Sequence, residues 1–382
     1  MPDRAPLFPV RRGHLDRLSN DIGIMQHAIG SSPDPSHGYC TDDVARALLV
    51  DLVHQRELGW DAVADRAWRN MRFLGDAFDP RSAGFRNFRH ADGRWLDGPA
   101  SEDSQGRALL TLGEVMASAP DARMVAFASS LLERALPAAQ ELGALRALAS
   151  TMLGCDAALR RVPSAQFTLA YRRLADRIRT TFEASATPDW PWPEPILTYE
   201  NALPVQALIV GGHHLGDRPM VDAGLRALEW LVAVQTAPDG QCSPIGNGWW
   251  PRGGERSRFD QQPIEATALV LTAGAAFRVT GDEGHRATAE WAYAWYLGRN
   301  DLGIAVAEPE RGASHDGLTR DGVNANEGAE STLMWLLALE HIRILRSARV
   351  TAPRPGRAVV AGTAGAGAAG AGTAAAQTVG AR

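Results

Sequence analysis

Cysteines are few in this sequence, and they show no recognisable metal-binding pattern. Its 382 residues include three, Cys40, Cys155 and Cys242, which lie far apart along the chain. An odd and sparse set is typical of reduced thiols and argues against a disulfide framework, so we expect a cytoplasmic protein. Because no Cys-x-x-Cys or paired Cys/His spacing occurs, we expect no zinc site and no other metal or cofactor.

Long hydrophobic runs and blocks of positive charge are also missing. No stretch of eighteen apolar residues occurs, and the N-terminal segment is too charged to hold the apolar core of a signal peptide. The net charge is −5, and no cluster of Lys and Arg stands out. We therefore expect neither a membrane nor a nucleic acid as a partner.

Large apolar residues are scarce at the C-terminal end. From Thr351 the chain consists mostly of Ala, Gly and Thr. Such a segment buries too little surface to offset the entropy that ordering it would cost. We expect residues 351–382 to form a disordered tail and residues 1–350 to form the folded domain.

Strand patterns are nearly absent, whereas helical periodicity recurs along the whole folded part. One set of segments is amphipathic, and it covers residues 61–78, 121–140, 165–186, 217–235 and 284–299. A second set is apolar on most sides and rich in Ala and Leu, and its helices begin near Asp42, Glu102, Gly143, Glu200, Asp260 and Asn326. Alternation of buried and amphipathic helices predicts an (α/α)6 toroid, an all-α ring of six inner and six outer helices.

The loops between these helices are unequal in length. Connections from an inner helix to the next outer helix are short, but most connections from an outer to an inner helix are long, at about residues 79–101, 187–199, 236–259 and 300–326. The third repeat is the exception, with a tight turn near Leu142. Because neighbouring helices run antiparallel, the long loops and the N-termini of the inner helices share one rim, and we expect function there.

Acidic residues mark the beginnings of the inner helices. They are Asp42, Asp43, Glu102, Asp103, Glu200, Asp260, Glu265, Glu327 and Glu330. Any one of them could be a first-turn acid that only stabilises a helix N-terminus. A series at five of the six inner helices exceeds what capping needs. Carboxylates that lie close together acquire different pKa values, so that one can act as an acid and another as a base.

The long loops and helix starts also carry aromatic and polar groups of the kind that bind sugars. The candidates for substrate binding are Trp190, Trp192, Trp249, Trp250, Arg252, Arg107, Asn201 and Gln262, together with the acids Glu200, Glu265 and Glu327. Aromatic rings can stack on the apolar faces of sugar rings, while Arg, Asn and Gln side chains hydrogen-bond to hydroxyl groups. The alternative is that the tryptophans only pin long loops onto the ring.

Several motifs resemble a bacterial family of (α/α)6 proteins that are found beside, or fused to, sugar-handling enzymes. The motifs are HGYCTDDVARAL, ASEDSQGRAL, LTYENALPVQAL, FDQQPIEA, WYLGRND and NEGAESTL, and the resemblance covers about residues 12–346. Members of that family are commonly described as related to glycosidases or glycosyltransferases. The resemblance therefore implies an oligosaccharide or sugar as the substrate and a glycosyltransferase as a candidate partner.

The pattern is also similar to that of (α/α)6 glycoside hydrolases, many of which invert the sugar with acids at the N-termini of inner helices. This similarity implies Asp43 and Asp103 as the leading catalytic pair. Asp42, Glu102, Asp260 and Glu330 are further catalytic candidates. A carboxyl separation of about 6.5–9.5 Å would imply inversion of the anomeric centre, and about 5–5.5 Å would imply retention.

Three functional hypotheses remain open from the sequence. The first is a glycoside hydrolase-like enzyme, in which one carboxylic acid protonates the leaving oxygen and one carboxylate activates water. The second is a sugar epimerase or isomerase, which ranks lower because His37, His90 and His315 lack matching positions in the other repeats. The third is a non-catalytic sugar-binding partner of a glycosyltransferase, which would need the aromatic and Arg side chains but no acid pair.

Overall fold

The structure is a computed structural model, and it describes residues 4–96, 98 and 101–348. The tail expected at residues 351–382 lies outside the described residues. Within the described part, no helix is long and apolar enough to cross a membrane.

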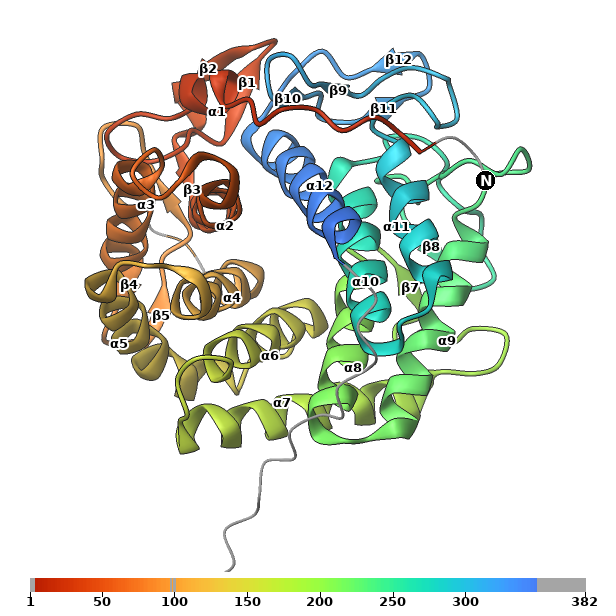
Figure 1. The fold of residues 1–382 in the computed structure, drawn as a ribbon, viewed down its shortest axis with the longest axis horizontal. Helices are drawn as coiled ribbons and strands as arrows, with labels where there is room; N and C mark the ends of the chain where they lie inside the picture. The colour runs from red at the N-terminus through yellow and green to blue at the C-terminus, as the bar shows by residue number, and fades with distance from the viewer. Residues whose placement is uncertain (1–3, 97, 99–100, 349–382) are drawn as a thin grey trace, which may run out of the picture.

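Six helices form a closed inner ring (Figure 1). They are α2 (Thr41–Leu58), α4 (Glu102–Ser118), α6 (Leu145–Leu159), α8 (Ala202–Leu215), α10 (Pro263–Thr280) and α12 (Ala329–Ser347). Each inner helix contacts the next one in this order, and α12 contacts α2, which closes the ring. The predicted (α/α)6 toroid is therefore confirmed.

An outer layer of helices surrounds the inner ring. It consists of α3 (Ala64–Ala77), α5 (Ala122–Ala139), α7 (Ala165–Ser185), α9 (Arg218–Val234) and α11 (Glu283–Ala294), with the six-residue α1 (Gly13–Leu18) outside α12. The helix predicted over 284–299 is shorter than expected. It ends at Ala294 because the following residues form turns, with Gly298 in a left-handed conformation (φ 92°).

The inner helices approach one another closely because small residues line their contacts. The closest approach joins α4 to α6, where a Cβ atom added at Gly113 would lie 1.9 Å from the carbonyl oxygen of Gly154. A Cβ atom at Gly154 would lie 2.4 Å from the carbonyl oxygen of Leu109. Only glycine therefore permits this helix spacing without a backbone shift.

The long loops carry short two-stranded antiparallel ribbons. Their strands are β1 (His27–Ile29), β2 (Ser32–Asp34), β3 (Tyr39–Cys40), β4 (Phe78–Asp79), β5 (Gly84–Phe85), β6 (Phe88–Arg89), β7 (Ile196–Leu197), β8 (Trp250–Pro251), β9 (Ala307–Glu308), β10 (Ala313–Ser314), β11 (Leu318–Thr319) and β12 (Gly322–Val323), and a 3-10 helix, η1, spans Pro35–His37. Two ribbons join loops of neighbouring repeats, because β3 pairs with β6 and β7 pairs with β8. The outer-to-inner loops therefore lie together on one rim.

Four inner helices begin later than the sequence predicts. Their observed starts lie two or three residues after the predicted ones, at Leu145 for Gly143, Ala202 for Glu200, Pro263 for Asp260 and Ala329 for Asn326. Glu200 and Asp260 have positive φ angles of 46° and 59°, which no right-handed helix can include. Both residues therefore end the loops that lead into α8 and α10, and they are not first-turn residues.

Candidate functional site

Arg46 gathers three carboxylates at the junction of α2 and α12. It lies one turn after Asp42 and Asp43 on α2, and its Nη1 atom is 3.1 Å from Asp42 Oδ2 and 2.9 Å from Asp43 Oδ1. Its Nη2 atom lies 2.8 Å from Oε2 of Glu330, in the first turn of α12. The Arg46 side chain is almost fully buried, so one guanidinium neutralises acids from both ends of the chain.

These three acids differ in pKa. Burial would raise the pKa of Asp42, but the Arg46 charge and the Cys40 thiol hold it below its ordinary value. Burial and the neighbouring Asp42 charge raise the pKa of Asp43 well above its ordinary value. Burial also raises the pKa of Glu330, although Arg46 opposes the change. Their surroundings therefore lower the pKa of Asp42 and raise those of Asp43 and Glu330.

A second buried ion pair crosses the ring. Arg107 on α4 donates through Nη1 to Oε1 of Glu200 at 2.8 Å and through Nη2 to Oε2 at 2.5 Å. Glu200 precedes α8, which is separated from α4 by α6 along the ring. Burial would raise the pKa of Glu200, but the charges of Arg107 and Arg46 outweigh it and lower that pKa.

A third arginine, Arg146 at the start of α6, holds the loop that leads into α8. It donates to the carbonyl oxygen of Tyr199, to Oδ1 of Asn201 at 3.1 Å and to Oε2 of Glu194 at 3.1 Å. Asn201 in turn donates through Nδ2 to Oε2 of Glu265 on α10, at 3.0 Å. Burial raises the pKa of Glu265 to about 7.

The interior charges follow a pattern around the ring. The first three inner helices contribute the arginines Arg46, Arg107 and Arg146. The last three contribute glutamates at or just before their first turn, and these are Glu200, Glu265 and Glu330. The sequence analysis did not include Arg46, Arg146 or Tyr199. A signal for Arg46 was present, because Asp42 precedes Arg46 by four residues, as Asp103 precedes Arg107.

Asp103 and Glu102 have different surroundings although they are adjacent. Asp103 accepts a hydrogen bond from the Tyr199 hydroxyl, which brings it to the same interior as Arg146. Its Oδ1 atom is buried and has no hydrogen-bond partner among the described residues. Glu102 instead accepts from the backbone N–H groups of Gly143 and Ala144, at 2.9 and 2.5 Å. The Glu102 carboxylate therefore holds the tight turn before α6.

The remaining acid and amide candidates make no side-chain contact with the Arg46 cluster within residues 4–96, 98 and 101–348. Asp260 is exposed, and only its backbone carbonyl has a described partner, the N–H of Asn247. Gln262 is half-buried next to the fully buried Gln261, whose Nε2 atom lies 2.5 Å from Oδ2 of Asp301. Glu327 pairs with Arg311 on the side of α12 that faces α1.

The four candidate tryptophans are mostly packed. Trp190 and Trp192 are buried, and their indole N–H groups donate to the carbonyl oxygens of Glu194 and Ile196. Trp250 lies half-buried against Trp190, with ring centroids 5.3 Å apart. Trp249 is 42% exposed, so its ring is the most available of the four.

Arg252 hydrogen-bonds one of the loops that carry these tryptophans to the other. Its Nη2 atom donates to Thr187 at 2.9 Å and to Asp189 at 3.0 Å, both in the loop that holds Trp190. The described contacts thus fit the alternative that Trp190, Trp192 and Trp250 pin loops, and they leave Trp249 as the candidate for stacking on a ligand.

Two groups of side chains have the composition of a metal site. Cys40, Asp42 and Asp43 form one, and Glu308, His315 and Glu327 form the other. In each group an arginine contacts both carboxylates: Arg46 contacts the two aspartates, and Arg311 contacts the two glutamates. The Arg46 side chain is only 2% exposed and that of Arg311 is 36% exposed, so a metal cation is less favoured at the first group than at the second. All three cysteines of the chain are buried and form no disulfide.

No protein-family model matches the chain, and no curated protein matches it by sequence. Solved structures do match its fold. A sugar epimerase from a ruminal bacterium has a TM-score of 0.67 at 13% identity, over 88% of this chain and 95% of that one. The cellobiose 2-epimerase from Bacillus thermoamylovorans has a TM-score of 0.66 at 14% identity, over 87% and 95%. A GH76 alpha-mannanase from Bacteroides thetaiotaomicron has a TM-score of 0.58 at 11% identity, over 87% and 95%.

These comparisons extend over nearly the whole length of each chain. At 10–15% identity, they show that the fold is shared and leave the reaction open. The chain is thus an (α/α)6 toroid of the same architecture as known sugar epimerases and a mannanase.

Proposed function

We propose that this chain is a carbohydrate-active enzyme of the glycoside hydrolase type, with its site in the ring interior around Arg46. One observation carries the proposal. Asp42 and Glu330 share the Arg46 guanidinium, and burial and charge move their pKa values in opposite directions. Two neighbouring titratable groups whose pKa values are shifted in opposite directions are typical of a general acid and base pair.

Glu330 is the proposed general acid and Asp42 the proposed base. Both side chains retain access to solvent, with exposed fractions of 38% for Glu330 and 18% for Asp42. Asp43, the leading candidate from the sequence, is only 5% exposed at its side chain and lies behind Arg46. We therefore assign Asp43 a role in positioning Arg46 and keep Asp103, with Tyr199, as a substrate-binding group.

In this reaction, protonated Glu330 would donate its proton to the leaving glycosidic oxygen as the bond to the anomeric carbon breaks. Ionised Asp42 would accept a proton from the attacking water, whose oxygen bonds to the anomeric carbon. Arg46 would keep both carboxyl groups in place, and it would favour the ionised form of Glu330 after proton transfer. Tyr199, Arg146 and Trp249 offer hydroxyl, guanidinium and aromatic surfaces for the sugar.

The test uses the purified chain with a panel of oligosaccharides, followed by NMR of the anomeric protons. We expect Asp42→Asn and Glu330→Gln each to lower kcat by at least about 100-fold while circular dichroism stays unchanged. Asp321→Asn, an exposed acid in the β11–β12 ribbon, is the matched control and should keep full activity. Full turnover in both site variants would show that the pair is wrongly assigned.

A sugar epimerase or isomerase is the second candidate, because the neighbours with TM-scores of 0.65–0.67 are described as epimerases and a D-mannose isomerase. The same NMR experiment separates the two. A hydrolase releases two smaller sugars from a disaccharide, whereas an epimerase or isomerase changes the reducing sugar and leaves the glycosidic bond intact. Binding without turnover across the panel would instead favour a sugar-binding partner of another enzyme.

A further inference from the structure

Four side chains from three separate segments meet beside the N-terminus of α12. His14 belongs to α1, Glu308 ends β9, His315 follows β10, and Glu327 lies two residues before α12. Glu308, His315 and Glu327 each place one possible ligand atom within 4.8 Å of those of the other two. His14 Nδ1 lies 3.6 Å from Glu327 Oε2, and His315 Nε2 lies 3.3 Å from Glu308 Oε1.

The tautomer of His14 follows from its hydrogen bond. Its Nε2 atom is 2.8 Å from the carbonyl oxygen of Glu327, and a carbonyl oxygen only accepts, so Nε2 carries the proton. In a neutral ring, Nδ1 then presents a lone pair towards a carboxylate oxygen. His14 is 1% exposed, and neither Nδ1 nor Glu327 Oε2 has a hydrogen-bond partner among the described residues. Two buried acceptors that face each other are stabilised by a proton or a metal cation placed next to them.

Each carboxylate keeps one oxygen on the inner side of the cluster. Arg311 contacts Oε2 of Glu308 at 2.6 Å and also pairs with Oε1 of Glu327. The other oxygens, Glu308 Oε1 and Glu327 Oε2, face the two histidines. The His315 atom that faces Glu308 Oε1 is Nε2, whereas Nδ1 of the same ring is buried without a partner within the described ranges. The cluster therefore offers two carboxylate oxygens and two imidazole nitrogens that Arg311 does not use.

We propose that Glu308, His315 and Glu327 bind one divalent transition-metal ion of the zinc type, next to the buried contact between His14 and Glu327. Imidazole nitrogen and carboxylate oxygen together are the donor set that suits Zn²⁺ and its first-row neighbours. The spacing of Glu308, His315 and Glu327 matches no common metal-binding motif, so the sequence did not indicate this site.

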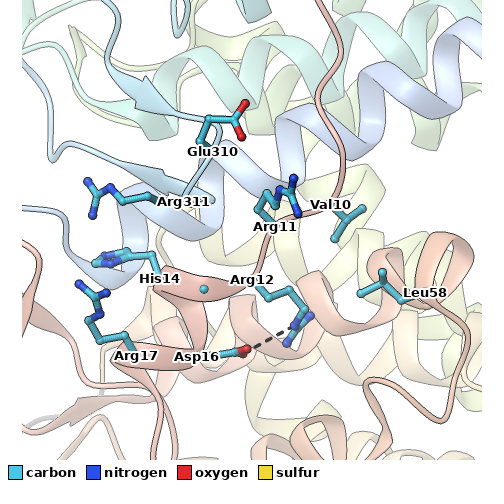
Figure 2. A pocket seen from close by; sticks show the side chains of 10 residues that line it. Val10, Arg11, Arg12, His14, Asp16, Arg17, Leu58, Glu310 and Arg311 are labelled. Atoms are coloured by element: carbon cyan, nitrogen blue, oxygen red, sulfur yellow. Dashed lines mark ion pairs between the residues drawn. The ribbon is translucent and has the colours of Figure 1, made fainter.

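A groove lies next to the cluster, on the side where His14 and Arg311 contact Glu327. It has a volume of about 560 Å³, and His14 and Arg311 are among the residues that line it. Figure 2 shows these two side chains on the same side of the groove, with Arg17 below His14 and Glu310 above Arg311. Arg311 is the cation that an incoming metal ion would have to compete with at the two glutamates.

A bound ion would connect the β9–β10 ribbon to the start of α12. Glu327 lies three residues before Glu330, so the ion would stabilise the turn that presents the proposed general acid. The metal proposal does not depend on that reaction, because it rests on ligand geometry alone.

The test uses the full chain, stripped with a chelator and titrated with Zn²⁺ against a chromophoric competitor. We expect one bound equivalent and an affinity that falls at least about tenfold in Glu308→Gln and in His315→Gln. Glu308 is partly exposed, so its substitution should leave the fold intact. Arg311→Gln should raise the affinity, because it removes the competing guanidinium. His90→Gln, at a partly exposed histidine, should match the unsubstituted chain.

Substitution of Co²⁺ for Zn²⁺ distinguishes this cluster from the one at Cys40. A site made of imidazole and carboxylate should show d–d absorption bands but no thiolate charge-transfer band, and Cys40→Ser should bind normally. The proposal is overturned if no equivalent binds, if Glu308→Gln and His315→Gln leave affinity unchanged, or if Cys40→Ser abolishes binding.

Discussion

Buried titratable residues also occur away from the site, on the outer side of α2. Arg12 donates through Nη2 to Asp51 at 2.6 Å and through Nη1 to His54 Nδ1 at 2.8 Å. Burial raises the pKa of Asp51 to about 6, and burial together with the Arg12 charge lowers the pKa of His54 to about 3. Because Arg12 can only donate, His54 must be neutral to accept this bond.

The neutral state of His54 predicts how stability depends on pH. Below an unfolded pKa of about 6.5, the unfolded chain binds a proton that folded His54 does not, so this residue's contribution is lost as the pH falls from about 6.5 towards 3. His54→Gln retains an acceptor but cannot titrate. We expect urea unfolding between pH 4 and 6.5 to show a smaller dependence of the free energy of unfolding on pH in this variant than in the unsubstituted chain. The two slopes should differ by up to about 1.4 kcal/mol per pH unit. Equal slopes in both proteins would contradict a neutral His54. Asp51 has a raised pKa and therefore makes stability change with pH in the opposite direction, but it is present in both proteins and does not affect the comparison.

At the scale of the element, the contact between α4 and α6 depends on glycine residues, which have no side chain. Gly106, Gly113 and Gly154 each lie so close to backbone atoms of the facing helix that a Cβ atom would clash. Backbone cannot rotate away as a long side chain can, so the helices would have to separate. The same glycines bring Arg107 and Arg146 from adjacent helices into the ring interior.

Substitution of one of these glycines should therefore destabilise the ring. We expect Gly113→Ala to lower the free energy of unfolding by about 1–3 kcal/mol, because overpacking forces a backbone shift. Gly274→Ala is the matched control on inner helix α10, since its Cβ atom would meet only side-chain atoms, the nearest 3.3 Å away on Leu345. It should be neutral or stabilising through the better helix propensity of Ala. Similar losses in both variants, measured by chemical denaturation, would show that close α4–α6 contact is unimportant.

At the scale of the whole molecule, Arg107 and Glu200 join helices that do not neighbour each other in the ring. Both side chains are about 93% buried, and the pair forms two hydrogen bonds. Removal of one partner from a buried pair leaves an uncompensated charge, which costs far more than replacement of both partners.

We expect Arg107→Met to lower the free energy of unfolding by about 3–5 kcal/mol. The double variant Arg107→Met, Glu200→Gln should recover part of this loss, because it leaves no unpaired charge. A double-mutant cycle from denaturant unfolding measures the coupling. If the two losses simply add, the pair does not brace the ring.

Much of this architecture could be predicted from the sequence because helical periodicity is local. The apolar stripes place the inner and outer helices, and the unequal loops correctly predict that the long loops lie on one rim. Helix starts were less predictable at Glu200 and Asp260, since a positive φ angle leaves little trace in the residue type of an acid.

Roles within the rim could be predicted only in part. Glu102 and Trp192 have the residue types of a sugar site, yet one caps the turn before α6 and the other packs against Phe182. Arg46 and Tyr199 were missed because each acquires its partners only when distant helices meet.

The sequence by itself determined the helices, their alternation around a ring and the rim on which the acids gather, since each depends on side-chain pattern within a few turns. Tertiary structure alone decided which acids share a guanidinium, which are buried and which reach solvent. Those outcomes depend on contacts such as Arg46 with Glu330 and His14 with Glu327, whose partners lie about three hundred residues apart in the chain. Electrostatic coupling acts through distance in space, and only closure of the ring sets that distance.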